Sequence, residues 1–197
     1  MFRRALLCSI LAMLAGMLSI SQTQAQTCTG TIVYPSADET TGPGEIMGGT
    51  YLNAQSSNNV REAFNERIHT NGASRLYHRW RFDNVPPGAV SLIREGYRLS
   101  TPDGDNFRFR GWYGEGEYFF FGNICPITSD VESTQKCSLN HETYYTETFH
   151  MYIEDTLQGI GSGTDLNAVA VDFIAICSEP VEEPPCDPPP PPGGFCP

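Results

Sequence analysis

The stretch RLYHRWRF, from Arg75 to Phe82, decides the fold, because its side chains change character at every second position. The even positions hold Leu76, His78, Trp80 and Phe82, and the odd positions hold Tyr77, Arg79 and Arg81. Successive side chains of a β-strand point to opposite faces, so this pattern predicts a strand with one buried and one solvated side. His78 shares the apolar side with Trp80, and we expect it to be a hydrogen-bonded histidine of the core.

Five further segments show a strand pattern. They are VSLIREGYRL (90–99), NFRFRGW (106–112), EYFFFGNI (117–124), YYTETFHMYI (144–153) and AVAVDFIAI (168–176). The sequences NVPPG, PDGD, YGEGE and GIGSGTD between them are rich in turn-forming residues. Eight or nine strands joined by such turns predict an all-β protein, an antiparallel two-sheet β-sandwich of the jelly-roll type. In NNVREAFNERI (58–68), where Val60, Phe64 and Ile68 lie four residues apart, a helix is the alternative.

The two ends of the chain differ in composition from its middle. Residues 1–25 begin with two arginines, continue with the apolar run ALLCSILAMLAGMLSI and end in TQA, which predicts a secretory signal peptide. Residues 178–197 contain nine of the fifteen prolines and predict a disordered or polyproline II tail. Residues 27–177 then form one β-sandwich domain, which we expect a bacterium to export to the extracellular space or the periplasm.

The net charge of the chain indicates which classes of binding partner it can have. Lys and Arg number 12 and Asp and Glu number 23, and the predicted signal peptide removes Arg3 and Arg4, so the mature net charge is 10 − 23 = −13. An acidic protein is repelled by nucleic acid and by anionic membrane surfaces. We therefore expect neither nucleic-acid binding nor membrane insertion.

Six cysteines remain after the predicted cleavage, and an even number in an exported chain indicates disulfides. They are Cys28, Cys125, Cys137, Cys177, Cys186 and Cys196. Zinc is the alternative, but the sequence contains no C-x-x-C pair. Cys125 and Cys137 are neighbours in sequence, and Cys28 and Cys177 lie at the two ends of the domain, although the sequence alone does not fix the pairing. Cys186 and Cys196 are open to a bridge within the tail, with the body or with a second chain.

Four segments in chain order, SRLYHRWRF, VSLIREGYRLSTPDGDNFRFRGW, YIEDT and LNAVAVDFIAI, resemble a β-sandwich module of secreted bacterial and archaeal proteins. The shared pattern is a W-x-F strand, an E-x-Y strand, a DGD-x-F-x-F corner, a D-T segment and a final V-D-hydrophobic-I strand. The sequence is also similar to the galactose-binding-like jelly rolls, to which many carbohydrate-binding modules belong. The resemblance covers most of residues 36–176 and implies an extracellular binding role without catalysis. The sequence departs from the pattern after the corner, where WYGEGEY replaces a serine-rich turn.

Acidic residues on loops and on the last strand suggest a structural calcium ion, which takes six to eight oxygen ligands. The candidate ligands are Asp103, Asp105, Asn106, Asp155, Asp165 and Asp172. In the modules that this sequence resembles, an acidic residue on the last strand often helps to hold calcium, and Asp172 occupies that place. The alternatives are an ordinary Asp-Gly turn at Asp103, and pairing of Asp172 with an arginine or with hydrogen-bond donors.

Arginines and aromatic residues supply a candidate ligand-binding face. The candidates are Tyr77, Arg79, Arg81, Arg108, Arg110, Trp112, Tyr113 and Tyr118. Guanidinium groups bind carboxylates and sulfates, and aromatic faces stack on sugar rings, so these residues indicate a platform for an anionic glycan. We expect the last three of them to reach solvent. We place Trp80, Phe107, Phe109 and Phe149 in the core. The alternative for the arginines is pairing on a solvated sheet face with Glu95, Glu115, Glu117 or Asp83.

Motifs of catalysis are weak in this chain. The four histidines, His69, His78, His141 and His150, have no metal-binding spacing, and GIGSG does not fit the G-x-S-x-G motif. We therefore expect a non-catalytic extracellular binding module for a glycan or another surface polymer, with structural calcium. The alternative is a structural surface or filament subunit that self-associates through its tail.

Overall fold

The computed structural model describes residues 28–39, 44–68, 74–100, 106–113, 118–143, 145–156 and 166–181, with residues 45 and 118–123 described by their backbone alone. These residues form thirteen strands, and among them no helix has the length and apolarity to cross a membrane. The strands are β1 (Thr31–Val33), β2 (Ala37–Asp38), β3 (Glu45–Gly48), β4 (Glu62–Asn65), β5 (Arg67–Ile68), β6 (Ser74–Arg75), β7 (Tyr77–Val85), β8 (Gly88–Ser100), β9 (Phe107–Tyr113), β10 (Tyr118–Ile127), β11 (Ser133–Thr143), β12 (Glu147–Asp155) and β13 (Ala168–Glu179). The predicted all-β class is confirmed.

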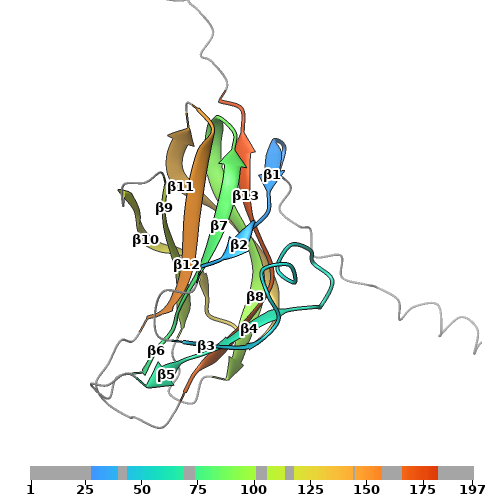
Figure 1. Ribbon diagram of the computed structural model, residues 1–197, viewed down its shortest axis with the longest axis vertical. Coiled ribbons are helices and arrows are strands. Elements are labelled where there is room, and N and C mark those ends of the chain that lie inside the picture. Colours follow the sequence, from blue (N-terminus) through green and yellow to red (C-terminus); the bar gives the residue numbers. More distant parts are fainter. Residues whose placement is uncertain are drawn as a thin grey trace, which may run out of the picture.

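The strands form two large antiparallel sheets and a small hairpin of β5 and β6 (Figure 1). The six-stranded sheet has the order β11-β8-β13-β4-β3, with β1 also paired to β13. The five-stranded sheet has the order β10-β9-β12-β7-β2. When the eight principal strands β4 and β7 to β13 are numbered in chain order, the two sheets read 1-8-3-6 and 2-7-4-5. This order is that of a jelly roll, which confirms the predicted fold.

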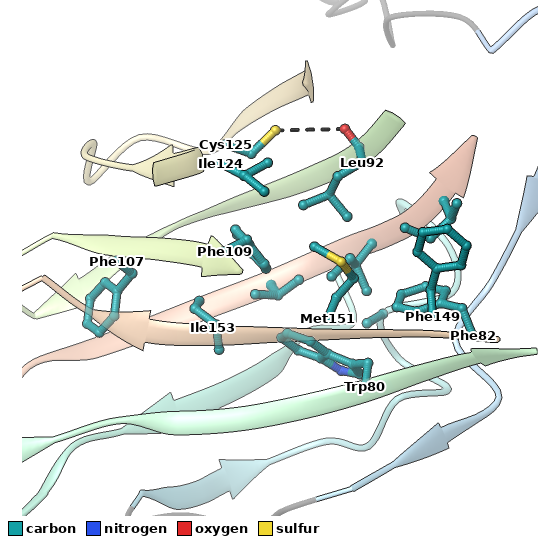
Figure 2. Packing of buried hydrophobic residues seen from close by; sticks show 14 of the residues in the cluster. Trp80, Phe82, Leu92, Phe107, Phe109, Ile124, Cys125, Phe149, Met151 and Ile153 are labelled. Carbon is teal, nitrogen blue, oxygen red and sulfur yellow. Dashed lines mark hydrogen bonds between the residues drawn. The ribbon is translucent and has the colours of Figure 1, made fainter. Parts of the chain in front are cut away.

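The core lies between the two sheets and is built from the inward positions of both (Figure 2). In β7 the predicted alternation holds, because Leu76 just before the strand and His78, Trp80 and Phe82 within it are at most 2% exposed. Phe107, Phe109 and Phe149 are fully buried, as predicted. The burial of these large rings is the main favourable contribution to folding.

The segment from Asn58 to Ile68, for which a helix is the alternative interpretation, forms the strands β4 and β5. A spacing of four is also an even spacing, so it fits a strand face as well as a helix face. Phe64 is fully buried, whereas Val60 and Ile68 are about half exposed. The remaining inward positions of this segment hold Glu62 and Glu66, which are both at most 1% exposed.

Strand β10 is irregular, and a buried arginine compensates for its irregularity. The pairing of β10 with β9 shifts register on both sides of Ile124, and Cys125 has a φ of 46°. Such bulges release carbonyl groups from the sheet ladder. Arg94 of β8, which is 1% exposed, donates hydrogen bonds to the carbonyl oxygens of Cys125 and Pro126, and to that of Ser133 at 2.9 Å. Burial lowers the pKa of Arg94 to about 10, so the guanidinium stays charged at neutral pH.

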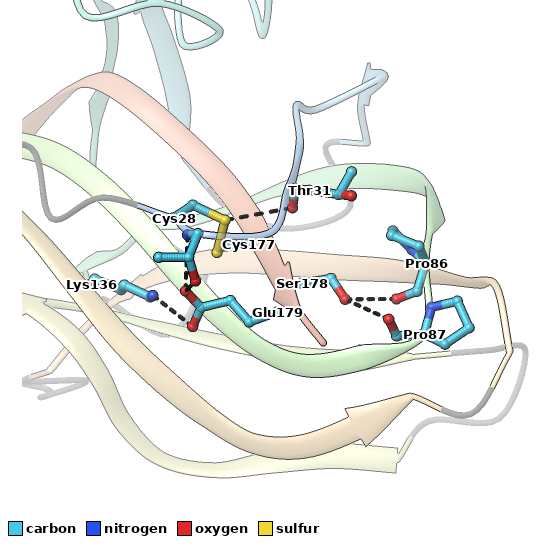
Figure 3. The surroundings of a disulfide bond; sticks show 9 residues. Cys28, Thr31, Pro86, Pro87, Lys136, Cys177, Ser178 and Glu179 are labelled. Carbon is cyan, nitrogen blue, oxygen red and sulfur yellow. Dashed lines mark hydrogen bonds and ion pairs between the residues drawn. A yellow bond between two sulfur atoms is a disulfide. The ribbon is translucent and has the colours of Figure 1, made fainter. Parts of the chain in front are cut away.

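Two disulfides join segments of the sandwich. Cys28 is bonded to Cys177, which ties the segment before β1 to the end of β13, and Cys125 is bonded to Cys137, which ties β10 to β11. Figure 3 shows the first bridge beside an ion pair between Lys136 and Glu179. The prediction that these four cysteines form disulfides is confirmed, and the structure supplies the pairing that the sequence left open. Cys186 and Cys196 lie outside the described residues, as does most of the predicted tail.

Candidate functional site

The outer face of the five-stranded sheet gathers most of the predicted binding residues. Antiparallel pairing of β7, β12 and β9 places their outward side chains in three rows across the sheet. The rows are Tyr77–Glu154–Arg108, Arg79–Tyr152–Arg110 and Arg81–His150–Trp112. Glu39, which follows β2, joins these rows at one edge, because its backbone N–H donates to the carbonyl of Arg79. We call these ten residues the outer-face network.

Aromatic rings form the centre of the outer-face network. The ring of Trp112 is stacked on that of His150, with centroids 5.1 Å apart and an interplanar angle of 16°, and the guanidinium carbon of Arg79 lies 5.0 Å from the Trp112 ring centroid. Tyr152 lies beside Tyr77, with ring centroids 4.5 Å apart. The guanidinium of Arg110 lies 5.9 Å from the Tyr152 ring centroid. Arginines over aromatic faces gain both packing and cation–π attraction.

Carboxylates hold the arginines of the network in position. Glu39 Oε2 forms an ion pair with Arg79, whose Nε is 2.9 Å away, and lies 2.9 Å from His150 Nδ1. Glu154, which is 4% exposed, pairs with both Arg108 and Arg110. Arg81 pairs with Asp83 at 2.8 Å, one of the pairings expected under the alternative interpretation of the arginines. The arginines are therefore fixed in position by local partners.

The expected exposure of the aromatic residues is only partly correct. Trp112 lies on the outer face, but Arg79 and His150 cover it and it is 9% exposed, so the expectation that it reaches solvent is wrong. Tyr113 belongs to the opposite face of β9, where its ring is stacked on His141 with centroids 3.9 Å apart. It packs against the core and is not part of the outer-face network. The side chain of Tyr118 lies outside the described residues.

A second polar cluster lies on the six-stranded sheet and contains one of the predicted calcium ligands. Glu95, Glu132 and Asp172 offer carboxylate oxygens that all lie within 4.8 Å of one another. Asp172 sits where β13 shifts register against β8, and its Oδ2 accepts a hydrogen bond from the backbone N–H of Asn59 at 3.1 Å. Its Oδ1 is buried and has no hydrogen-bond partner among the described residues. Burial is the main cause that raises the pKa of Asp172.

The structure brings together two other predicted calcium ligands at a different place. Asn106 and Asp155 lie at one end of the five-stranded sheet, where the backbone N–H of Thr156 donates to the carbonyl of Asn106. The side-chain oxygen of Asn106 accepts from Arg98, and Asp155 accepts from the backbone N–H of Leu76. Asp172 belongs to the other sheet. Asp103, Asp105 and Asp165 lie outside the described residues, so the calcium assignment stays a prediction.

A third cluster, between the sheets, was missed by the sequence analysis. Asp38 of β2, Glu62 of β4 and His78 of β7 lie within 4.8 Å of one another by one ligand atom each. His78 Nε2 is 3.4 Å from Asp38 Oδ1 and 3.4 Å from Glu62 Oε1. Burial, opposed in part by the hydrogen bond from Trp80, raises the pKa of Glu62 to about 8. The three residues come from three separate segments, so no local spacing could have indicated the cluster.

Comparison with known proteins gives distant likenesses in structure. No family model matches the chain, and no curated protein sequence is significantly similar to it. The chain is similar in structure to the carbohydrate-binding module TmCBM61 in complex with β-1,4-galactotriose, with 9% identity and a TM-score of 0.44 over 74% of this chain and 91% of that one. It is also similar to a family 16 carbohydrate-binding module, with 12% identity and a TM-score of 0.35 over 75% of this chain and 86% of that one.

Proposed function

We propose that this protein is an extracellular binding module that holds a glycan on the outer-face network of its five-stranded sheet. The observation that carries the proposal is the alignment of arginine and aromatic side chains in three parallel rows across β7, β12 and β9. Residues of one face recur every second position along a strand, which is about 7 Å. An array of three such rows suits an extended polymer better than a small molecule.

The chemistry of the network favours sugars that carry acidic groups. The four arginines of the network pair with three carboxylates, those of Glu39 and Glu154 in the network and of Asp83 beside it, so cations outnumber carboxylates among these described residues in a chain that is acidic as a whole. A guanidinium that uses one edge for a carboxylate still offers N–H groups to a second acceptor. Uronate carboxylates and sugar sulfates are acceptors of the right geometry, and neutral hydroxyl groups are weaker ones.

The test measures polysaccharide binding by affinity electrophoresis and calorimetry. We expect the wild type to bind uronate- or sulfate-bearing polymers, and Arg110→Ala to weaken this binding about 10-fold, since a charge-assisted hydrogen bond contributes roughly 1.5–3 kcal/mol. The matched control is Arg61→Ala, because Arg61 also covers a tyrosine ring, that of Tyr97 at 4.9 Å, and also pairs with a glutamate. Arg61 belongs to the surface of the other sheet, beside Glu132, and its loss should leave binding unchanged.

Failure to bind any acidic or neutral polysaccharide would remove the proposal. Equal loss of binding in the Arg110→Ala and Arg61→Ala variants would place the ligand somewhere other than on the outer-face network. Binding that persists in both variants would also place the ligand elsewhere than on the outer-face network.

Calcium binding is the second part of the proposal, and the cluster of Glu95, Glu132 and Asp172 is the place where described residues fit it. Three carboxylates within 4.8 Å and a buried oxygen of Asp172 without a hydrogen-bond partner suit an oxygen-seeking cation. Calcium added to chelator-treated protein should raise the melting temperature of the wild type. It should not raise that of Asp172→Asn, and an unchanged wild type would contradict calcium binding.

A further inference from the structure

The buried cluster of Asp38, Glu62 and His78 joins the two sheets of the sandwich at one edge. Glu62 belongs to β4 of the six-stranded sheet, and the other two residues belong to β2 and β7 of the five-stranded sheet. Glu62 and His78 are at most 1% exposed, and the side chain of Asp38 is 21% exposed. Two carboxylates and an imidazole in such a place are costly to bury unless a counter-charge satisfies them.

Each carboxylate of the cluster has one oxygen held by a donor. Trp80 Nε1 donates to Glu62 Oε2 at 2.8 Å, and the backbone N–H of Tyr51 donates to Asp38 Oδ2 at 3.0 Å. The other oxygens, Glu62 Oε1 and Asp38 Oδ1, are buried and accept no well-aligned hydrogen bond among the described residues, so their nearest polar partners are His78 and each other. Both of these oxygens lie 3.4 Å from His78 Nε2.

These separations match those of ligands around one metal ion. Oxygen and nitrogen ligands at about 2.0–2.1 Å from a tetrahedral ion lie about 3.3–3.4 Å from one another. The donors from Trp80 and Tyr51 occupy the positions of outer-sphere partners, which orient the ligating oxygens of a metal site. We propose that Asp38, Glu62 and His78 bind a divalent transition-metal ion such as zinc, which joins β2 and β7 to β4.

The ligand set favours a transition metal over calcium or magnesium. Imidazole nitrogen is a good ligand for zinc, cobalt and nickel, whereas calcium and magnesium prefer oxygen ligands throughout. The partial exposure of Asp38 leaves a route from solvent by which an ion could enter. This site lies on the inner side of the five-stranded sheet, so it is separate from the outer-face network and from the carboxylates around Asp172.

The experiment uses the full protein after treatment with chelator and removal of the chelator. Cobalt(II) serves as a spectroscopic probe and zinc as a competitor, with metal uptake measured by elemental analysis. We expect one cobalt ion per chain with an intense visible d–d absorption, displacement of cobalt by zinc, and a higher melting temperature with zinc. Calcium should not compete at this site.

Glu62→Gln is the informative variant, because glutamine keeps an acceptor for Trp80 and removes the ligand charge. It should weaken zinc binding at least about 10-fold, as should Asp38→Asn. The matched control is Glu147→Gln, since Glu147 Oε2 also lies 3.4 Å from a histidine nitrogen, Nε2 of His141. This variant should bind zinc like the wild type.

Two results would overturn the inference. The first is wild-type protein that takes up no stoichiometric cobalt or zinc, in which case Asp38 and Glu62 share a proton beside His78 as a purely structural cluster. The second is metal uptake that Glu62→Gln and Asp38→Asn leave unchanged, which would locate the metal elsewhere. Circular dichroism of each variant reports whether it folds, and the wild-type titration decides the question even where a variant does not.

Discussion

The two tryptophans of the chain lie on opposite faces of the five-stranded sheet, and both have polar partners. Trp80 points into the sandwich, is fully buried and donates to the equally buried Glu62. Trp112 points outward, where the His150 ring stacks on it and the Arg79 guanidinium lies over its ring. The side-chain types are similar on the two faces, but the access of water is not.

The access of water determines how much each set of polar contacts contributes to the stability of the fold. A buried polar group that loses its partner bears the full cost of its desolvation, whereas a group near the surface exchanges its partner for water at little cost. The inner contacts should therefore matter for stability and the outer contacts for recognition. Matched substitutions on the two faces test this division.

The largest difference should separate the interior of the sandwich, where Arg94 of the six-stranded sheet is buried, from the outer face of the five-stranded sheet, where Arg110 lies. Arg94→Met removes the donors to the carbonyl oxygens of Cys125, Pro126 and Ser133 and should lower the free energy of unfolding by about 3–5 kcal/mol. Arg110→Met removes an outer-face cation and should lower it by less than about 1 kcal/mol. Urea unfolding of both variants measures the contrast, and equal losses would contradict the division between the faces.

A smaller contrast should separate the two tryptophans. Trp80→Phe leaves Glu62 Oε2 without its indole donor and creates a small cavity, so it should cost about 2–4 kcal/mol. Trp112→Phe keeps an aromatic ring beneath Arg79 and should cost about 1 kcal/mol. The measurement is again urea unfolding, with near-ultraviolet circular dichroism to confirm native packing. A more damaging Trp112→Phe would show that the outer-face network stabilises the fold.

The sequence predicts the sheet architecture well because alternation is a local signal. RLYHRWRF places three arginine and tyrosine side chains outside and the apolar ones inside, and the structure agrees. The outer-face network follows from the same alternation in β7 and β9. The alternation does not reveal whether neighbouring side chains cover an outward residue. Trp112 occupies an outward position and is nevertheless buried, because side chains from β7 and β12 lie over it.

The buried cluster of Asp38, Glu62 and His78 could not be predicted from the sequence, for a related reason. Glu62 stands at an inward strand position, where an acidic residue is uncommon and is normally read as exposed. Its partners Asp38 and His78 are brought to it by pairing between β2 and β7 and by the packing of two sheets. Contacts of that kind depend on tertiary structure, and the spacing of residues in the sequence does not predict them.

The smallest effect should come from an ion pair at the surface of the six-stranded sheet. Glu179 accepts from Lys136 at 2.8 Å and from the backbone N–H and hydroxyl of Thr29, and these partners lower its pKa to about 2 (Figure 3). A folded-state pKa below the unfolded value means that the stabilisation is present above about pH 4.5 and is lost as the pH falls toward about 2. The wild type should therefore exceed Glu179→Gln by about 0.5–1 kcal/mol at neutral pH, a modest value because the pair is screened by solvent. Urea unfolding of both proteins between these pH values should show the difference shrinking in acid. A difference that stays constant with pH would mean that hydrogen bonding to Thr29, which glutamine can also accept, or packing accounts for it instead of charge.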